Sequence, residues 1–156
     1  MMISVEELKH RELAGLEALY LQQGPAPRPP QGVFRGHFLR WLETQGARHP
    51  VWRPLVALMF QLIPFGVDFN ERRWFFFGAP WLAAGRFAPR LQRSRWRETE
   101  VVCLDYDVSA LPGPIRGLLY DEVQPLNESL CLGLGGINAP RGQGDLFFMA
   151  LERVEA

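Results

Sequence analysis

The spacing of apolar residues divides the chain into a helical N-terminal part and a longer part with strand-like patterns. Apolar residues recur at helical spacing from Leu13 to Tyr20, and Ser4 with Glu7 forms the capping-box pattern that begins a helix. Four prolines in the nine residues Gly24–Gly32 then end the helix, because proline lacks the backbone N–H that a helix interior needs. The sequence therefore predicts an N-terminal helix followed by an extended strap.

The most apolar segment of the chain is Val51–Leu82, which raises the question of a membrane anchor. Its longest uncharged run, Pro54–Val67, has 14 residues, whereas a spanning helix needs about 20. Pro54 suits a first helical turn, and Pro64 ends the pattern. We therefore expect a buried helix over 54–64 that does not span a membrane.

Most of the remaining chain alternates short apolar runs with turns rich in glycine and proline. Such a pattern without intervening helices predicts an antiparallel meander, which curls as strand twist accumulates. The first run could also form a helix, since Phe34, Phe38 and Trp41 recur at helical spacing, but its β-branched and aromatic content favours a strand. The expected strands are Gly32–Leu42, Arg72–Phe77, Trp81–Ala88, Arg95–Val108, Ile115–Val123, Ser129–Ile137 and Asp145–Val154.

These elements define the predicted fold class as α+β and mainly β, an antiparallel barrel or half-barrel with N-terminal and covering helices. One domain is expected over 1–156, with a helix and Pro-rich strap over 1–31 and a barrel with the inserted helix 54–64 over 32–156. The last strand, Asp145–Val154, is apolar on both faces. It should therefore be covered by the barrel interior on one side and by a helix on the other.

Charge and cysteine content narrow the function classes. The 17 basic and 17 acidic residues cancel, which argues against generic nucleic-acid binding. Five arginines in Arg86–Arg97 are interpreted as a solvated strand face, with an anion clamp as the alternative. Cys103 and Cys131 have no CxxC context, and three scattered histidines have no zinc-ligand spacing. We expect free buried thiols, a cytoplasmic protein, and neither a metal nor a cofactor.

Adjacent carboxylates at Asp121 and Glu122 are the leading candidates for chemistry, together with Tyr120. Neighbouring strand residues point to opposite faces, so one carboxylate must face the barrel interior. A buried carboxylate without a partner is unfavourable, so an arginine such as Arg116 is expected to meet it. The arrangement fits either a structural ion pair or catalytic groups.

Aromatic residues, eleven phenylalanines and five tryptophans among them, exceed what the core of a chain this size requires and suggest an aromatic-lined pocket. Alternation along residues 102–108 is expected to carry Tyr106 inward, leaving the Asp105 and Asp107 carboxylates facing outward. His37 is the one histidine inside a strand-like run and fits a structural residue or a site residue. The expected ligand-binding residues are Tyr106, Arg116, Arg73, Trp74, Phe76, Trp81 and His37.

Five short motifs stand out along the chain: Leu16–Tyr20, Leu104–Tyr106, Tyr120–Glu122, Leu130–Gly133 and Phe147–Glu152. They resemble the motifs of a group of small bacterial proteins with lipocalin-like or GXWXG-type β-barrel domains, and the resemblance implies a lipocalin-like barrel. The chain departs from the group's pattern in having "PFGVDF" without a lysine, and a tyrosine where an arginine precedes Asp-Glu. The resemblance implies a barrel fold and a cavity, and it names no reaction.

Together the patterns favour binding of a hydrophobic small molecule in an aromatic-lined cavity. The first alternative is a cofactor-independent isomerase, cyclase or hydratase that acts on a hydrophobic metabolite. The second is a structural or partner-binding domain, and a homodimer is left open. A buried polar pair beside the cavity would favour the enzyme. A wholly apolar cavity would favour the binding protein, and a filled barrel would favour the structural domain.

Overall fold

The computed structural model describes residues 3–22, 28–42, 52–77, 79–117, 119–137 and 145–154, and most of them belong to one antiparallel sheet. The strands are β1 (Val33–Trp41), β2 (Phe65–Asp68), β3 (Arg73–Phe76), β4 (Ala79–Arg86), β5 (Ala88–Arg93), β6 (Glu100–Asp105), β7 (Leu119–Pro125), β8 (Leu130–Ile137) and β9 (Asp145–Arg153). The helices are α1 (Val5–His10), α2 (Leu13–Gln22), α3 (Trp52–Leu62), α4 (Gly113–Arg116) and the 3-10 turn η1 (Tyr106–Val108).

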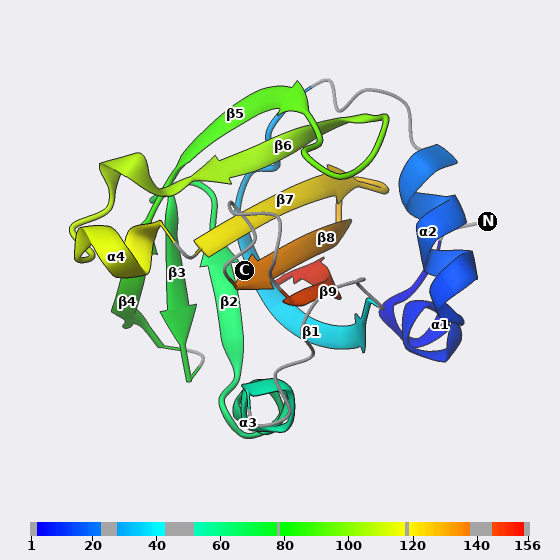
Figure 1. Ribbon diagram of the computed structural model, residues 1–156, viewed down its shortest axis with the longest axis horizontal. Coiled ribbons are helices and arrows are strands. Elements are labelled where there is room, and N and C mark those ends of the chain that lie inside the picture. The colour runs from blue at the N-terminus through cyan, green and yellow to red at the C-terminus, as the bar shows by residue number, and fades with distance from the viewer. Residues whose placement is uncertain are drawn as a thin grey trace.

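The sheet closes almost completely into a barrel because its two edge strands are consecutive in sequence. The strand order is β4-β3-β2-β1-β9-β8-β7-β6-β5, so β4 and β5 lie at opposite edges of the sheet. A single residue, Phe87, connects them, and Gly85, near the end of β4, has the left-handed backbone (φ 67°) that favours glycine. The edges therefore meet at this corner, and the strands surround a common interior (Figure 1). This arrangement confirms the predicted fold class of a mainly-β antiparallel barrel.

The strand predictions for 32–42, 129–137 and 145–154 are confirmed within a residue or two, and the helix alternative for the first is wrong. Two strands were not predicted: β2, which is buried on both faces and shows no alternation, and the arginine-containing edge strand β5. The strand predicted from Ile115 begins only at Leu119, because Pro114 falls in the first turn of the short helix α4.

One apolar cluster fills part of the barrel interior. It includes Phe34, Phe65, Val102, Leu104, Tyr106, Val123, Cys131, Phe147 and Met149. Apart from Tyr106 of η1, these residues alternate along their strands with residues that face outward, as the period of two requires. Both cysteines are buried and free, which confirms the prediction for the thiols, and burial raises the pKa of Cys103 to about 11 and that of Cys131 to about 12.

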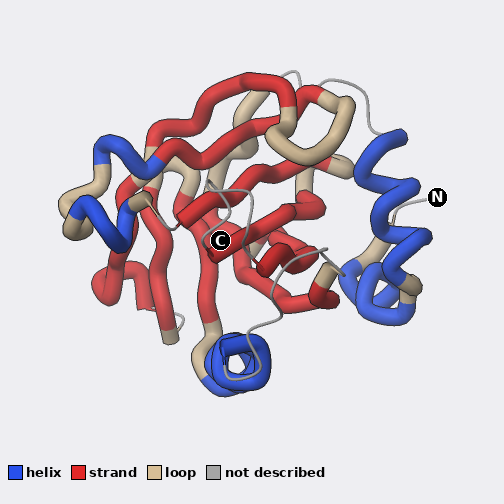
Figure 2. The backbone as a smooth tube through the Cα atoms, in the orientation of Figure 1, coloured by secondary structure: helices blue, strands red, loops and turns tan. Residues whose placement is uncertain are grey.

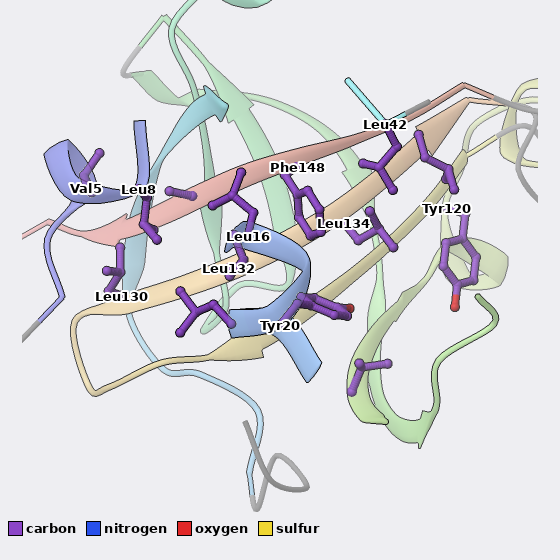
Figure 3. Packing of buried hydrophobic residues seen from close by; sticks show 14 of the residues in the cluster. Val5, Leu8, Leu16, Tyr20, Leu42, Tyr120, Leu130, Leu132, Leu134 and Phe148 are labelled. Atoms are coloured by element: carbon purple, nitrogen blue, oxygen red, sulfur yellow. The ribbon is translucent and has the colours of Figure 1, made fainter. Parts of the chain in front are cut away.

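A second apolar cluster lies outside the barrel, where α1 and α2 cover β7, β8 and β9 (Figure 3). Leu16 and Tyr20 of α2 pack there against Leu132 and Phe148, and each of these side chains is almost completely buried. The N-terminal helix is two helices rather than one, because the Arg11 backbone is extended. The capping box of Ser4 and Glu7 is present as predicted. These helices supply the outer cover that the two-sided apolar strand β9 requires.

Helix α3 crosses one end of the barrel, separate from α1 and α2 (Figure 2). The prediction that it is buried is wrong, since Leu55, Leu58 and Leu62 are at least half exposed. Phe60 anchors it, with ring centroids 4.9 Å from Phe65 and 5.1 Å from Phe147. In the part of the chain that the structure describes, no helix combines the length and apolar character needed to cross a membrane.

Gly66 provides a test of the packing between β1, β2 and β3. A Cβ atom at this position would lie 2.5 Å from the backbone oxygen of Phe34 and 2.3 Å from the Phe75 ring. Because a strand backbone cannot move without breaking its ladder, Gly66→Ala should lower the free energy of unfolding in urea by roughly 1–3 kcal/mol or more. The control Gly15→Ala, in helix α2 with its nearest neighbour at 3.9 Å, should raise it by about 0.5–1 kcal/mol. Equal stability of Gly66→Ala and the wild type would contradict this packing.

Candidate functional site

A cavity of about 230 Å³ remains inside the barrel, between the inner apolar cluster and α3. Six aromatic residues line it: Phe60, Phe65, Trp74, Phe76, Tyr106 and Phe147. Met59 of α3 also lines the cavity and is 40% exposed, so the cavity reaches the surface beside that helix. The barrel is therefore not filled by its own side chains, and the space is lined mainly by apolar groups.

Asp121 brings the one carboxylate among the described residues that line this cavity. It lies on β7, with Leu104 of β6 and Gly135 of β8 as its register partners. The absent side chain of Gly135 leaves room for it, because a Cβ there would lie 2.7 Å from Asp121 Oδ1. Local sequence therefore places a carboxylate inside the barrel wall at a point where the neighbouring strand has no side chain.

A chain of two donors leads to this carboxylate. The Trp74 indole N–H donates to the Tyr106 hydroxyl oxygen at 2.5 Å, and the Tyr106 hydroxyl donates to Asp121 Oδ2. Burial raises the pKa of Asp121 to about 7; the charge of Glu122 adds to the rise and the Tyr106 hydrogen bond opposes it. Burial also raises the pKa of Tyr106 well above its usual range, so Tyr106 is a neutral donor. Asp121 is thus a group that can hold or release a proton near neutral pH.

Glu122 faces the opposite side of the barrel wall, beneath α2. It is fully buried and accepts hydrogen bonds from Tyr20 at 2.8 Å, Ser94 at 2.5 Å and Tyr120 at 2.6 Å. Burial raises the pKa values of Tyr20 and Tyr120, with the Glu122 charge as the next cause, so both remain donors. The Arg97 guanidinium binds Glu17 beside this cluster. Three hydroxyl groups therefore donate to Glu122, and the expected arginine is represented by Arg97, which acts on Glu122 through its charge without a hydrogen bond to it.

Of the predicted site residues Tyr106, Tyr120, Glu122 and Arg116, the structure places one at the cavity. Tyr106 lines the cavity, whereas Tyr120 and Glu122 belong to the outer cluster. Arg116 lies on α4 and donates to the backbone oxygens of Asp107 and Ser109. The separation has a simple cause: Tyr120 and Glu122 share a parity along β7 that is opposite to that of Asp121.

Some of the other predicted site residues line the cavity, and others lie on the outer face of the barrel. Trp74 and Phe76 line the cavity, and Arg73 alternates with them on the other face of β3. His37 hydrogen-bonds Glu152 at 3.1 Å on the outer face, and burial lowers its pKa. The side chain of Trp81 lies outside the described residues. The expected outward position of Asp105 and Asp107 agrees with the ion pair of Asp105 with exposed Arg90 at 2.9 Å.

Several cavity residues were not predicted from the sequence: Met59, Phe60, Phe65, Leu111, Leu119, Phe147 and Met149. Among the described residues, no group of three or more His, Cys, Asp or Glu side chains gathers as a metal site would require. A second hollow, between β1, the β2–β3 turn and the end of β9, has a rim that includes Asn70, Glu128 and Arg153. It lies apart from Asp121 and Tyr106.

Comparison with known proteins supports the fold and leaves the function open. No protein-family model matches the chain, and no curated protein matches it. A crystal structure described as a protein from Thermomonospora curvata is similar, with a TM-score of 0.52 and 17% identity over 93% of this chain and 89% of that one. The two chains share a barrel architecture.

The hydrogen bond from Tyr20 to Glu122 predicts that loss of the Tyr20 hydroxyl destabilises the protein and helix α2 in particular. Tyr20→Phe removes one of three donors from a fully buried carboxylate, and a hydrogen bond to a charged group contributes about 1.5–3 kcal/mol. The variant should lose this amount of unfolding free energy and show faster amide exchange in α2. The control Asp107→Asn, an exposed carboxylate, should change stability by less than about 0.5 kcal/mol. Wild-type stability of Tyr20→Phe would mean that Glu122 does not depend on this donor.

The raised pKa of Asp121 predicts that the free energy of unfolding falls as pH rises. A carboxylate with a lowered pKa has the opposite effect. Its folded pKa of about 7 lies above the ordinary aspartate value of 3.8, so between these values the native state binds the extra proton. Its contribution to stability is therefore lost as pH rises toward 7. Asp121→Asn cannot ionise, so its advantage over the wild type should grow by about 2–3 kcal/mol between pH 5 and pH 8.

Urea denaturation at the two pH values measures this difference. The exposed-carboxylate variant Glu128→Gln serves as the control and should show a constant difference from the wild type. An advantage of Asp121→Asn that is the same at both pH values would show that the carboxyl is not strongly perturbed.

Proposed function

We propose that the protein binds a hydrophobic small molecule in the barrel cavity. The observation that carries the proposal is an unfilled, aromatic-lined space of about 230 Å³ that reaches the surface beside α3 and contains a buried polar pair, Asp121 and Tyr106. An apolar pocket with few oriented polar groups is the usual form of a small-molecule site. The motif resemblance to lipocalin-like and GXWXG-type barrels supports the same proposal.

A second candidate function is cofactor-independent acid–base catalysis on the bound molecule, by an isomerase, cyclase or hydratase. The observation that favours it is the Asp121 carboxyl, whose pKa of about 7 suits proton transfer near neutral pH. In this case Asp121 replaces Glu122 and Tyr120 as the candidate catalytic group, because those two side chains lie on the outer face of the barrel.

The two buried free thiols support the further proposal of a cytoplasmic location.

Isothermal titration with 1-naphthylmethanol, a neutral aromatic probe, tests the binding proposal. We expect saturable binding of one molecule per chain. Leu119→Trp should abolish it, because Leu119 lines the cavity and is only partly buried, so a larger ring can enter the cavity. The control Val108→Trp places the same ring at an exposed position and should bind as the wild type does.

Unchanged binding in Leu119→Trp would contradict this site, and the absence of binding to the wild-type protein would contradict the proposed function. Chemical conversion of a bound compound that is lost in Asp121→Asn would instead support the enzyme.

A further inference from the structure

We propose that the ligand of the cavity is an apolar molecule carrying one protonated amine, and that Asp121 binds this amine. The inference rests on the proposed function and specifies the chemical class of its ligand. Three features of the described residues lead to it: the charge balance around Asp121, the open hydrogen-bonding positions of its carboxylate, and the aromatic walls of the cavity.

Among the described residues, no positively charged side chain lies near enough to Asp121 to compensate its charge. Its hydrogen bond comes from the neutral Tyr106 hydroxyl, and the charge that acts on it is the negative carboxylate of Glu122 across the sheet. The described cavity lining contains no Lys, Arg or His. Burying a carboxylate is unfavourable unless a partner compensates for lost hydration, so a ligand that brings a cation gains more than a neutral one.

The carboxylate also keeps an acceptor position for the ligand. Tyr106 occupies Oδ2, and no other described residue donates to Asp121. Trp74 donates to the Tyr106 hydroxyl oxygen, so the Tyr106 proton is directed to Asp121 Oδ2, and this hydrogen bond favours the charged form of Asp121. An ammonium group is donor-only and charge-assisted, which matches the open Oδ1 position.

Aromatic walls add a second attraction for a cation. Phe60, Phe65, Trp74, Phe76 and Phe147 line the same cavity as Asp121. The faces of aromatic rings attract cations, and the attraction is largest where water is excluded. The rings also accept the apolar body of the ligand. The cavity should therefore favour a hydrophobic amine over a neutral alcohol of equal shape and should reject a carboxylic acid.

The competing ligand class is a neutral carbonyl compound that accepts a hydrogen bond from protonated Asp121. The two classes predict opposite effects of pH. Asp121 must lose its proton to pair with an amine and must keep it to donate to a carbonyl oxygen. The groups that act on its titration are the Tyr106 hydroxyl from η1 and the Glu122 carboxylate on the same strand, while its register partners are Leu104 and Gly135.

The experiment is a calorimetric comparison of 1-naphthylmethylamine, 1-naphthylmethanol, 1-acetylnaphthalene and 1-naphthoic acid at pH 8 and pH 6. At pH 8 the amine should bind at least tenfold tighter than the alcohol, and the acid more weakly than either. Lowering the pH to 6 should weaken amine binding several-fold, leave alcohol binding within threefold, and reveal proton release in buffers of different ionisation enthalpy. Asp121→Asn should remove the amine preference and the proton release.

Failure of this inference is distinguishable from failure of the proposed function. If the alcohol binds as tightly as the amine, or if Asp121→Asn keeps the amine preference, the amine assignment is wrong and the binding proposal stands. If the acetyl compound binds most tightly and gains affinity at pH 6, the ligand is a carbonyl acceptor instead. If none of the four compounds binds, the proposed function itself is contradicted.

Discussion

The structure depends on how one strand satisfies two adjacent buried carboxylates. Strand β7 directs Asp121 into the barrel and Glu122 out beneath α2, because successive side chains of a strand face opposite sides. Each carboxylate loses water on folding and must be compensated locally. Glu122 receives three hydroxyl donors and thereby fixes the position of α2, whereas the one described donor to Asp121 is Tyr106. The same wall therefore carries a structural carboxylate on one face and an incompletely compensated one on the other.

Incomplete compensation at Asp121 fits the proposed function of the cavity. A fully apolar residue there would remove the desolvation cost, and the rise of the Asp121 pKa to about 7 measures how far the charged form is disfavoured. Strongly perturbed ionisable groups in cavities are typical of functional sites, where stability is given up for chemistry or binding. Gly135 and the aromatic walls fit the same interpretation, since they leave space around the carboxylate and keep the space apolar.

The sequence predicted the barrel and the division of Asp121 and Glu122 between two faces, because both follow from alternation and turn residues. Tyr106 faces inward as predicted, although the strand ends at Asp105 and Tyr106 begins the turn η1. The sequence could not show which of the two carboxylates faces the barrel interior, since both sides of β7 are buried. It also predicted an arginine partner where the protein uses hydroxyl groups: Tyr20 is 102 residues from Glu122 and Ser94 is 28, and neither pairing leaves a local pattern. The half-exposed α3 was predicted as buried because its apolar residues nearly surround the helix and the order of strands around it was unknown.

The central claim is that Asp121 is a desolvated carboxylate at the wall of a ligand cavity. Carbon-13 NMR titration of the labelled aspartate side chains, with Asp121→Asn for assignment, tests this most directly. The account predicts an Asp121 carboxyl that titrates near pH 7 in the free protein, and a lower titration midpoint when 1-naphthylmethylamine is bound. An Asp121 signal that titrates near pH 4 in the free protein and does not shift with the amine would contradict the account.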